Sequence, residues 1–288
     1  MAQGVEWVGP AASPEEPSRV PPEVQEEVRE LRDQVRRLQE QVNALAARPK
    51  AGGRIPTHVA GLDAALEGGI PRGHVVLLAG PTGAMKTSLA LYAVVKNRAA
   101  GARGLYVTIE EGRDSLIQTM RRLGLSEGDE FLVDVARLRL ERTSAEDVRD
   151  WMRVLRDYLA RRHEREALGL VVIDSLNALL ALAPGAEARG ELFTFFTFLR
   201  SLGATSILVE EQDPAAPRVD PQASFLADGV LELRFSGAGE GRVQLLLRCA
   251  KMRHTRHSRD YFVLHHDGKR FVANPYEAPR GRRWGRRG

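Results

Sequence analysis

A glycine-rich turn followed by a lysine–threonine pair stands in the segment LLAGPTGAMKTSLA, residues 77–90. Gly80, Lys86 and Thr87 fit the spacing G-x-x-x-x-G-K-[ST], in which backbone N–H groups and a helix N-terminus surround phosphate groups. In that pattern the lysine reaches the β- and γ-phosphates and the hydroxyl ligates magnesium. We therefore expect the segment to bind a nucleotide through Gly80, Pro81, Thr82, Gly83, Ala84, Met85, Lys86, Thr87 and Ser88.

Position 85 departs from this pattern, because Met85 stands where a glycine is usual. Only a left-handed backbone demands glycine, so a methionine fits if residue 85 already has the right-handed conformation of a helix start. On that interpretation Met85 preserves nucleotide binding and alters its affinity or turnover. The alternative is a loop that binds nucleotide without hydrolysing it.

Carboxylates end two of the apolar segments downstream. Asp174 ends LVVID and fits the second magnesium group that such sites take from the end of a neighbouring buried strand. Ser175 follows it where some nucleotidases carry a glutamate, so a general base must come from elsewhere. Glu110 and Glu111 end YVTIEE, and a carboxylate there can deprotonate water if that strand lies next to the loop strand. The alternative is a pair of solvated surface glutamates.

These residues require a particular arrangement of strands and helices. Apolar runs predict strands at 75–79, 104–111, 168–175 and 205–212, and amphipathic runs predict helices at 86–99, 113–123, 145–163 and 187–202. Alternating strands and helices indicate an α/β fold, with a mostly parallel sheet covered by helices on both faces. Three later runs, 230–235, 242–251 and 261–266, resemble an antiparallel meander that extends one edge of the sheet.

The N-terminal part has a different character. Residues 1–21 are rich in Pro, Ala and Glu and are expected to be disordered. Residues 22–48 carry a heptad with valine at a and leucine at most d positions, which favours a parallel two-stranded coiled coil. The alternative is an amphipathic helix that packs on its own domain. A linker at 49–54 then leads into the α/β domain, residues 55–276, and a basic, disordered tail at 277–288.

Composition excludes several classes of protein. The single cysteine, Cys249, forbids an intrachain disulfide and suggests a reducing compartment. No apolar run approaches the roughly 20 residues that cross a bilayer, and the N-terminus lacks the pattern of a signal peptide. We expect a cytoplasmic protein without membrane contact. The net charge of +4 does not by itself imply a nucleic-acid partner.

Residues 55 to about 275 resemble a single domain of the KaiC/RadA branch of the RecA-like ATPases. The resemblance rests on four segments in family order: GLDAALEGGIPRGHVVLLAGPTGAMKT, YVTIEE, LGLVVIDS and KMRHTRH. It implies a RecA-like fold, ATP and Mg2+ as ligands, and ATP hydrolysis. Met85 departs from the family, and KaiC has two such domains in tandem where this chain has one, so a circadian role is not implied.

The resemblance also assigns roles to residues. It implies that Lys86, Thr87 and Asp174 bind phosphate and magnesium and that Glu110 and Glu111 activate water. It implies that Lys251 and Arg253 act on the nucleotide of an adjacent subunit, with His257 contacting it. A group supplied across an interface requires a homo-oligomer, in this family most often a ring of six. From the residues alone, charged side chains after a strand are usually solvated.

The arginine-rich C-terminal tail leaves alternatives open. The tail RGRRWGRRG combines five arginines with a tryptophan, which suits single-stranded nucleic acid but is also common in disordered basic ends.

Taken together, the motifs favour an oligomeric ATPase that acts as a switch or regulator, with a possible protein client. The alternatives are a DNA-binding, RadA-like recombination or repair accessory ATPase and a nucleotide-sensing scaffold that does not hydrolyse ATP.

Overall fold

A computed structural model describes residues 53–126, 128–135, 137, 151–181, 188–212, 219–237 and 243–277. The expected N-terminal tail, the coiled-coil helix, most of the linker and nearly all of the basic tail lie outside the described residues. None of the described helices is long and apolar enough to cross a membrane.

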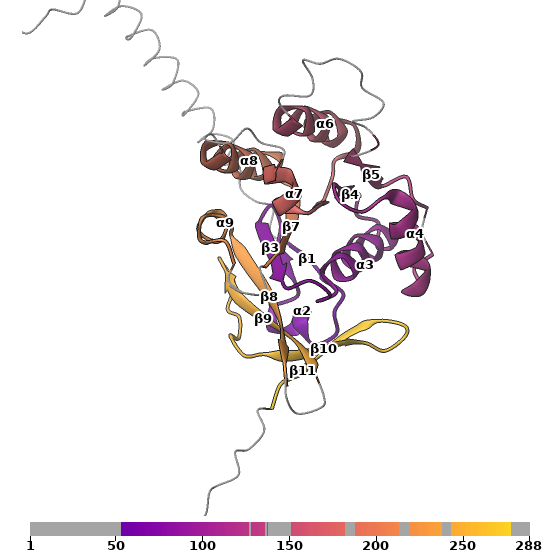
Figure 1. Ribbon diagram of the computed structural model, residues 1–288, viewed down its shortest axis with the longest axis vertical. Helices are drawn as coiled ribbons and strands as arrows, with labels where there is room; N and C mark the ends of the chain where they lie inside the picture. The colour runs from indigo at the N-terminus through magenta and orange to yellow at the C-terminus, as the bar shows by residue number, and fades with distance from the viewer. Residues whose placement is uncertain are drawn as a thin grey trace, which may run out of the picture. The chain divides into compact units, whose positions relative to one another are not determined.

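A nine-stranded sheet forms the centre of the described α/β domain (Figure 1). Its strand order is β11-β10-β9-β8-β3-β7-β6-β4-β5. The six strands from β8 to β5 are parallel, and β9, β10 and β11 continue the sheet in antiparallel fashion from β8. The bounds are β3 Val75–Gly80, β4 Gly104–Thr108, β5 Leu132–Asp134, β6 Leu170–Asp174, β7 Thr205–Glu211, β8 Gly229–Ser236, β9 Gln244–Met252, β10 Phe262–His266 and β11 Phe271–Pro275.

Helices cover both faces of this sheet because successive strand residues point to opposite sides. Val76 and Leu78 of β3 belong to the core cluster that contains α3 and α4, whereas Val75 and Leu77 belong to the cluster with α6 and α8. The helix bounds are α3 Lys86–Ala99, α4 Arg113–Arg122, α6 Trp151–Glu166, α7 Leu176–Ala181, α8 Ala188–Leu202 and α9 Pro221–Leu226. A short helix, α2 Leu62–Ala65, and a two-stranded sheet of β1 Arg54–Ile55 and β2 Ile70–Pro71 precede β3.

The predicted α/β architecture is confirmed, including the antiparallel extension at one edge. The strand predicted at 104–111 ends early, because β4 stops at Thr108, whose side chain donates a hydrogen bond to the backbone oxygen of Glu111 at 2.5 Å. This turn places Glu110 and Glu111 after the strand and not on it. The condition that this strand lies next to the loop strand is not met, because β7 and β6 separate β4 from β3. Asp174 was expected on a strand next to β3, but β7 separates β6 from it.

The carboxylate of Glu210 is buried near the carboxyl end of β7. Its side chain lies on the same face of β7 as that of Leu208, and Glu210 is 4% exposed to solvent. Its Oε1 accepts a hydrogen bond from the backbone N–H of Asp220, at 2.6 Å, and its Oε2 has no hydrogen-bond partner among the described residues. Burial raises the pKa of Glu210 to about 7, although the N–H of Asp220 acts in the opposite direction.

This raised pKa predicts a specific dependence of stability on pH. Between the ordinary pKa of 4.5 and about 7, folded Glu210 binds more protons than unfolded Glu210. The free energy of unfolding must therefore fall as the pH rises through that window and level off above it. The full difference is on the order of 3 kcal/mol, at 1.36 kcal/mol per unit of pKa.

Urea unfolding of the wild type and of Glu210→Gln at pH 5, 6, 7 and 8 measures this dependence. Because other groups titrate in both proteins, the difference between the two free energies isolates Glu210. We expect the glutamine variant to gain stability relative to the wild type as the pH rises. A difference that is the same at pH 5 and pH 8 would show that Glu210 does not titrate with a raised pKa.

Candidate functional site

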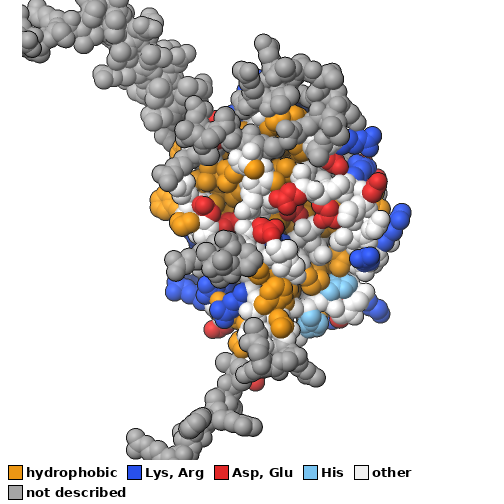
Figure 2. Space-filling view, viewed as in Figure 1, with side chains coloured by type: hydrophobic (Ala, Val, Ile, Leu, Met, Phe, Trp, Pro, Cys, Tyr) orange, Lys and Arg blue, Asp and Glu red, His pale blue; other side chains and the backbone are white. Residues whose placement is uncertain are grey.

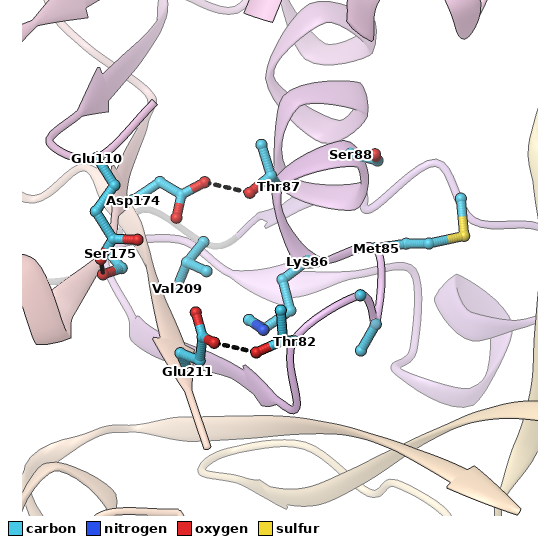
Figure 3. A pocket seen from close by; sticks show the side chains of 12 residues that line it. Thr82, Met85, Lys86, Thr87, Ser88, Glu110, Asp174, Ser175, Val209 and Glu211 are labelled. Atoms are coloured by element: carbon cyan, nitrogen blue, oxygen red, sulfur yellow. Dashed lines mark hydrogen bonds between the residues drawn. The ribbon is translucent and has the colours of Figure 1, made fainter. Parts of the chain in front are cut away.

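A pocket of about 360 Å³ opens at the carboxyl ends of the parallel strands (Figure 3). It lies where the loop after β3, the turn after β4 and the ends of β6 and β7 meet. Acidic side chains gather in the middle of the face shown in Figure 2. The described residues that line the pocket are Thr82, Gly83, Ala84, Met85, Lys86, Thr87, Ser88, Glu110, Asp174, Ser175, Val209 and Glu211.

The loop between β3 and α3 has the backbone of an anion-binding turn. Gly83 has φ +78°, and Met85 has φ 59° and ψ 24°, so both residues are left-handed. Alternation of left-handed and right-handed residues turns successive N–H groups toward one concavity, which suits a phosphate. The condition stated for a methionine to fit, a right-handed residue 85, is not met. Residue 85 has the conformation for which this loop pattern usually employs glycine.

The two glycines of the loop serve different purposes. A side chain on Gly80 would place its Cβ 2.8 Å from the Cβ of Leu233, so β3 and β8 pack closely only because residue 80 is glycine. Gly83 has open space around it and requires glycine for its positive φ alone. Pro81 does not line the pocket, but its carbonyl oxygen accepts a hydrogen bond from Lys86 Nζ at 2.8 Å.

The ammonium of Lys86 lies inside the pocket. Burial lowers the pKa of Lys86, and the nearby charges of Glu211, Asp174 and Glu110 raise it in opposition. Among the described residues that line the pocket, Lys86 is the one cation, and it faces three carboxylates. Because the acids outnumber the cation, a phosphate group needs further positive charge to enter this pocket favourably.

Asp174 connects the loop helix to the sheet. Its Oδ2 accepts hydrogen bonds from the Oγ1 of Thr87, at 2.7 Å, and from the hydroxyl of Tyr106, at 2.6 Å. Burial and the charge of Asp174 together raise the pKa of Tyr106 well above its usual value, so this phenol remains a donor. A hydroxyl and a carboxylate in contact are hard oxygen donors of the kind that Mg2+ prefers, so Thr87 and Asp174 fit this ion.

The structure separates the two glutamates that the sequence grouped together. Glu110 lines the pocket, and its carboxylate accepts a hydrogen bond from the hydroxyl of Ser175, which is joined to Asp174 by a cis peptide bond. The carboxylate of Glu111 accepts a hydrogen bond from the hydroxyl of Ser115, on α4, at 2.5 Å. Glu111 is not among the described residues that line the pocket. Of these two glutamates, only Glu110 lines the pocket in the described part of the chain.

Sequence reasoning missed Glu211, which ends β7 directly beside Gly80 of β3. Its carboxylate accepts a hydrogen bond from the hydroxyl of Thr82 (Figure 3). The side chain of Asn177 holds the backbone of Glu211 through two hydrogen bonds, of 2.7 and 3.1 Å. The sequence did offer a signal for Glu211, because the strand predicted at 205–212 carries two glutamates just before its last residue, and the segment that contains Glu110 also ends in two glutamates.

Lys251 and Arg253 lie near the amino ends of the parallel strands, opposite the pocket, where β9 ends beside the start of β8. Lys251 Nζ donates to the backbone oxygen of Ser224 at 2.8 Å, and burial lowers the pKa of Lys251. Arg253 is paired with Asp228 at 3.1 Å.

His257 follows Arg253 in the segment between β9 and β10, and its Nδ1 lies 3.1 Å from the backbone oxygen of Ser258. Lys251, Arg253 and His257 are not among the described residues that line the pocket of their own chain. If any of the three reaches a nucleotide, it must therefore be one bound to another subunit.

Comparisons with known proteins show the family and the fold of this chain. Residues 55–269 match the model of the ATPase family described as KaiC. The chain is 28% identical over 220 residues to the circadian clock protein KaiC3 of Synechocystis, with 73% of this chain covered but only 43% of that longer relative. It is also 28% identical over 242 residues to a UPF0273 protein of Thermotoga maritima, covering 80% of this chain and 99% of the relative.

A solved structure of a KaiC-like protein is similar in fold to this chain. The crystal structure of a KaiC-like protein from Pyrococcus horikoshii superimposes with a TM-score of 0.66 at 27% identity, covering 78% of this chain and all of the other. The matched region contains the phosphate-binding loop, the strand that ends in Asp174 and the turn that carries Glu110. The chain belongs to the KaiC family of ATPases, and its described domain has their RecA-like fold.

Proposed function

We propose that this protein binds ATP with Mg2+ and hydrolyses it as an oligomeric switch or regulator in the cytoplasm. The observation that carries the proposal is the convergence of Lys86, Thr87, Asp174 and Glu110 on one pocket at the carboxyl edge of the sheet. Parallel α/β sheets bind their ligands at this edge. Family membership supports an ATPase, and the arrangement of the side chains suggests the role of each.

The loop and α3 provide the binding groups. Loop N–H groups and the ammonium of Lys86 face the β- and γ-phosphates, while Thr87 and Asp174 hold Mg2+, which neutralises charge as it develops on the phosphate oxygens. Phosphate oxygens replace the carbonyl of Pro81 as acceptors for Lys86. This exchange is favourable, because a charged acceptor binds an ammonium more strongly than a neutral carbonyl does.

Glu110 is the candidate general base. Its carboxylate takes a proton from water as the water oxygen forms a bond to the γ-phosphorus, and the bond from that phosphorus to the bridging oxygen of ADP breaks. The hydroxyl of Ser175 orients this carboxylate through its hydrogen bond. Glu111, held by Ser115, supports the turn that presents Glu110.

Replacing each glutamate by glutamine separates these roles. We expect Glu110→Gln to lower the rate of phosphate release by about 100-fold or more while ATP still binds, because it removes the base and keeps the shape. We expect Glu111→Gln to lower the rate less than about tenfold, because it leaves the base in place. The measurement is steady-state phosphate release with ATP and Mg2+, next to equilibrium ATP binding by each protein.

The same assay decides between the candidate functions. If the wild type releases no more phosphate than Glu110→Gln while both bind ATP, the protein is a nucleotide-sensing scaffold and not an ATPase. Repeating it with single-stranded DNA at several salt concentrations tests the RadA-like alternative, which requires DNA-stimulated hydrolysis and a steep loss of binding with salt.

Action across a subunit interface makes a separate prediction. Arg253→Ala and Glu110→Gln should each hydrolyse ATP far more slowly than the wild type, and mixed oligomers should recover hydrolysis, because some sites then receive an intact base and an intact arginine from different subunits. Phosphate release and light scattering of the mixture measure this recovery. A mixture no more active than its separate components contradicts a role for Arg253 in trans.

A further inference from the structure

Met85 occupies a backbone conformation that its side chain disfavours. At φ 59° and ψ 24° it is left-handed, and it is the residue that precedes α3. An L-residue populates this region about 5- to 30-fold less than a right-handed one, because its Cβ approaches the following carbonyl oxygen. As the N-cap residue of α3, Met85 makes no capping hydrogen bond with its side chain. The hydrogen bond from the N–H of Leu89 to the Met85 carbonyl, at 2.9 Å, is one that any residue could accept.

The side chain of Met85 provides the compensation. It is partly buried and packs against the apolar core cluster on the α3 side of the sheet, as does Leu245 of β9. Figure 3 shows it extending away from Lys86, Asp174 and Glu211, on the far side of the loop. An unbranched thioether fits such an irregular surface well. Residue 85 therefore lines the pocket, and its partly buried side chain packs against the core cluster.

We propose that Met85 is a positioning residue, whose side chain anchors the loop in its anion-binding conformation. The proposal rests on the proposed nucleotide binding and adds a cause for it that a glycine could not supply. A glycine at this position adopts the left-handed region freely but also leaves it freely. Methionine pays a cost for the conformation and then holds it through burial, so the loop N–H groups are arranged before a phosphate arrives.

Substitutions separate the packing of the side chain from the energetic cost of a left-handed backbone. Met85→Ala keeps that cost and removes the packing, whereas Met85→Leu keeps both the cost and the packing. Met85→Gly removes both. Because apparent affinity falls with the population of the competent conformation, we expect alanine to weaken nucleotide binding roughly tenfold and leucine to restore it. Leu245→Ala is the matched control, because it removes apolar contact from the same cluster outside the loop.

Two measurements on the full chain test the anchor. Hydrogen exchange without nucleotide should show faster exchange of the loop amides at 83–87 in Met85→Ala than in the wild type or in Met85→Leu. Titration with a fluorescent ADP derivative and Mg2+ should give dissociation constants that rise from the wild type and Met85→Leu, through Met85→Gly, to Met85→Ala. Leu245→Ala should lower the melting temperature without changing either loop exchange or affinity.

Loop exchange and affinity of Met85→Ala equal to those of the wild type would overturn the inference, and so would a glycine variant that binds more tightly than the wild type. Failure of the wild type to bind nucleotide would instead refute the proposed function. The exchange comparison between alanine and leucine still decides the role of Met85 in that case.

Discussion

The arrangement of the site depends on two hydrogen bonds that the carboxylate of Asp174 accepts. It receives the hydroxyl of Thr87 from the first turn of α3 and the hydroxyl of Tyr106 from the middle of β4. Asp174 itself ends β6, so one side chain joins a helix and two strands in a place that is only 9% exposed to solvent. A buried carboxylate is tolerated when it is hydrogen-bonded in this way.

The carboxylate of Asp174 also adds to the negative charge of the pocket, so a bound nucleotide needs positive charge beside it. Lys86 brings one cation into a pocket that Asp174, Glu110 and Glu211 line with carboxylates. Nucleotide phosphates would add several negative charges to that excess. A divalent ion beside Thr87 and Asp174 offsets the repulsion at its source, which is why the proposed function requires magnesium for binding as well as for chemistry.

Most of the fold could be predicted from the sequence, because buried parallel strands and amphipathic helices leave clear periodic patterns. The bounds of α3, Lys86–Ala99, agree with the predicted helix. Strand order leaves no such pattern, and for that reason β7 was not expected between β3 and β6. Because the strand order was not predicted, Glu211 was not recognised as a site residue, since its position beside Gly80 follows from the pairing of β7 with β3.

Other features of the site depend on local geometry that residue types do not specify. Glu110 and Glu111 are chemically identical neighbours, and only the turn after Thr108 decides which of them enters the pocket. The left-handed conformation of Met85 contradicted the simplest interpretation of a missing glycine. Packing of its side chain on the core offers a physical reason why this loop tolerates methionine.

Equilibrium binding of a fluorescent ATP derivative, measured with Mg2+ and again with excess chelator, tests the account most directly. If Thr87 and Asp174 hold the ion that offsets three carboxylates, the wild type binds the nucleotide with Mg2+ and loses most of its affinity when the ion is removed. Equal affinity under both conditions, or no binding under either, would contradict the proposed role of this pocket.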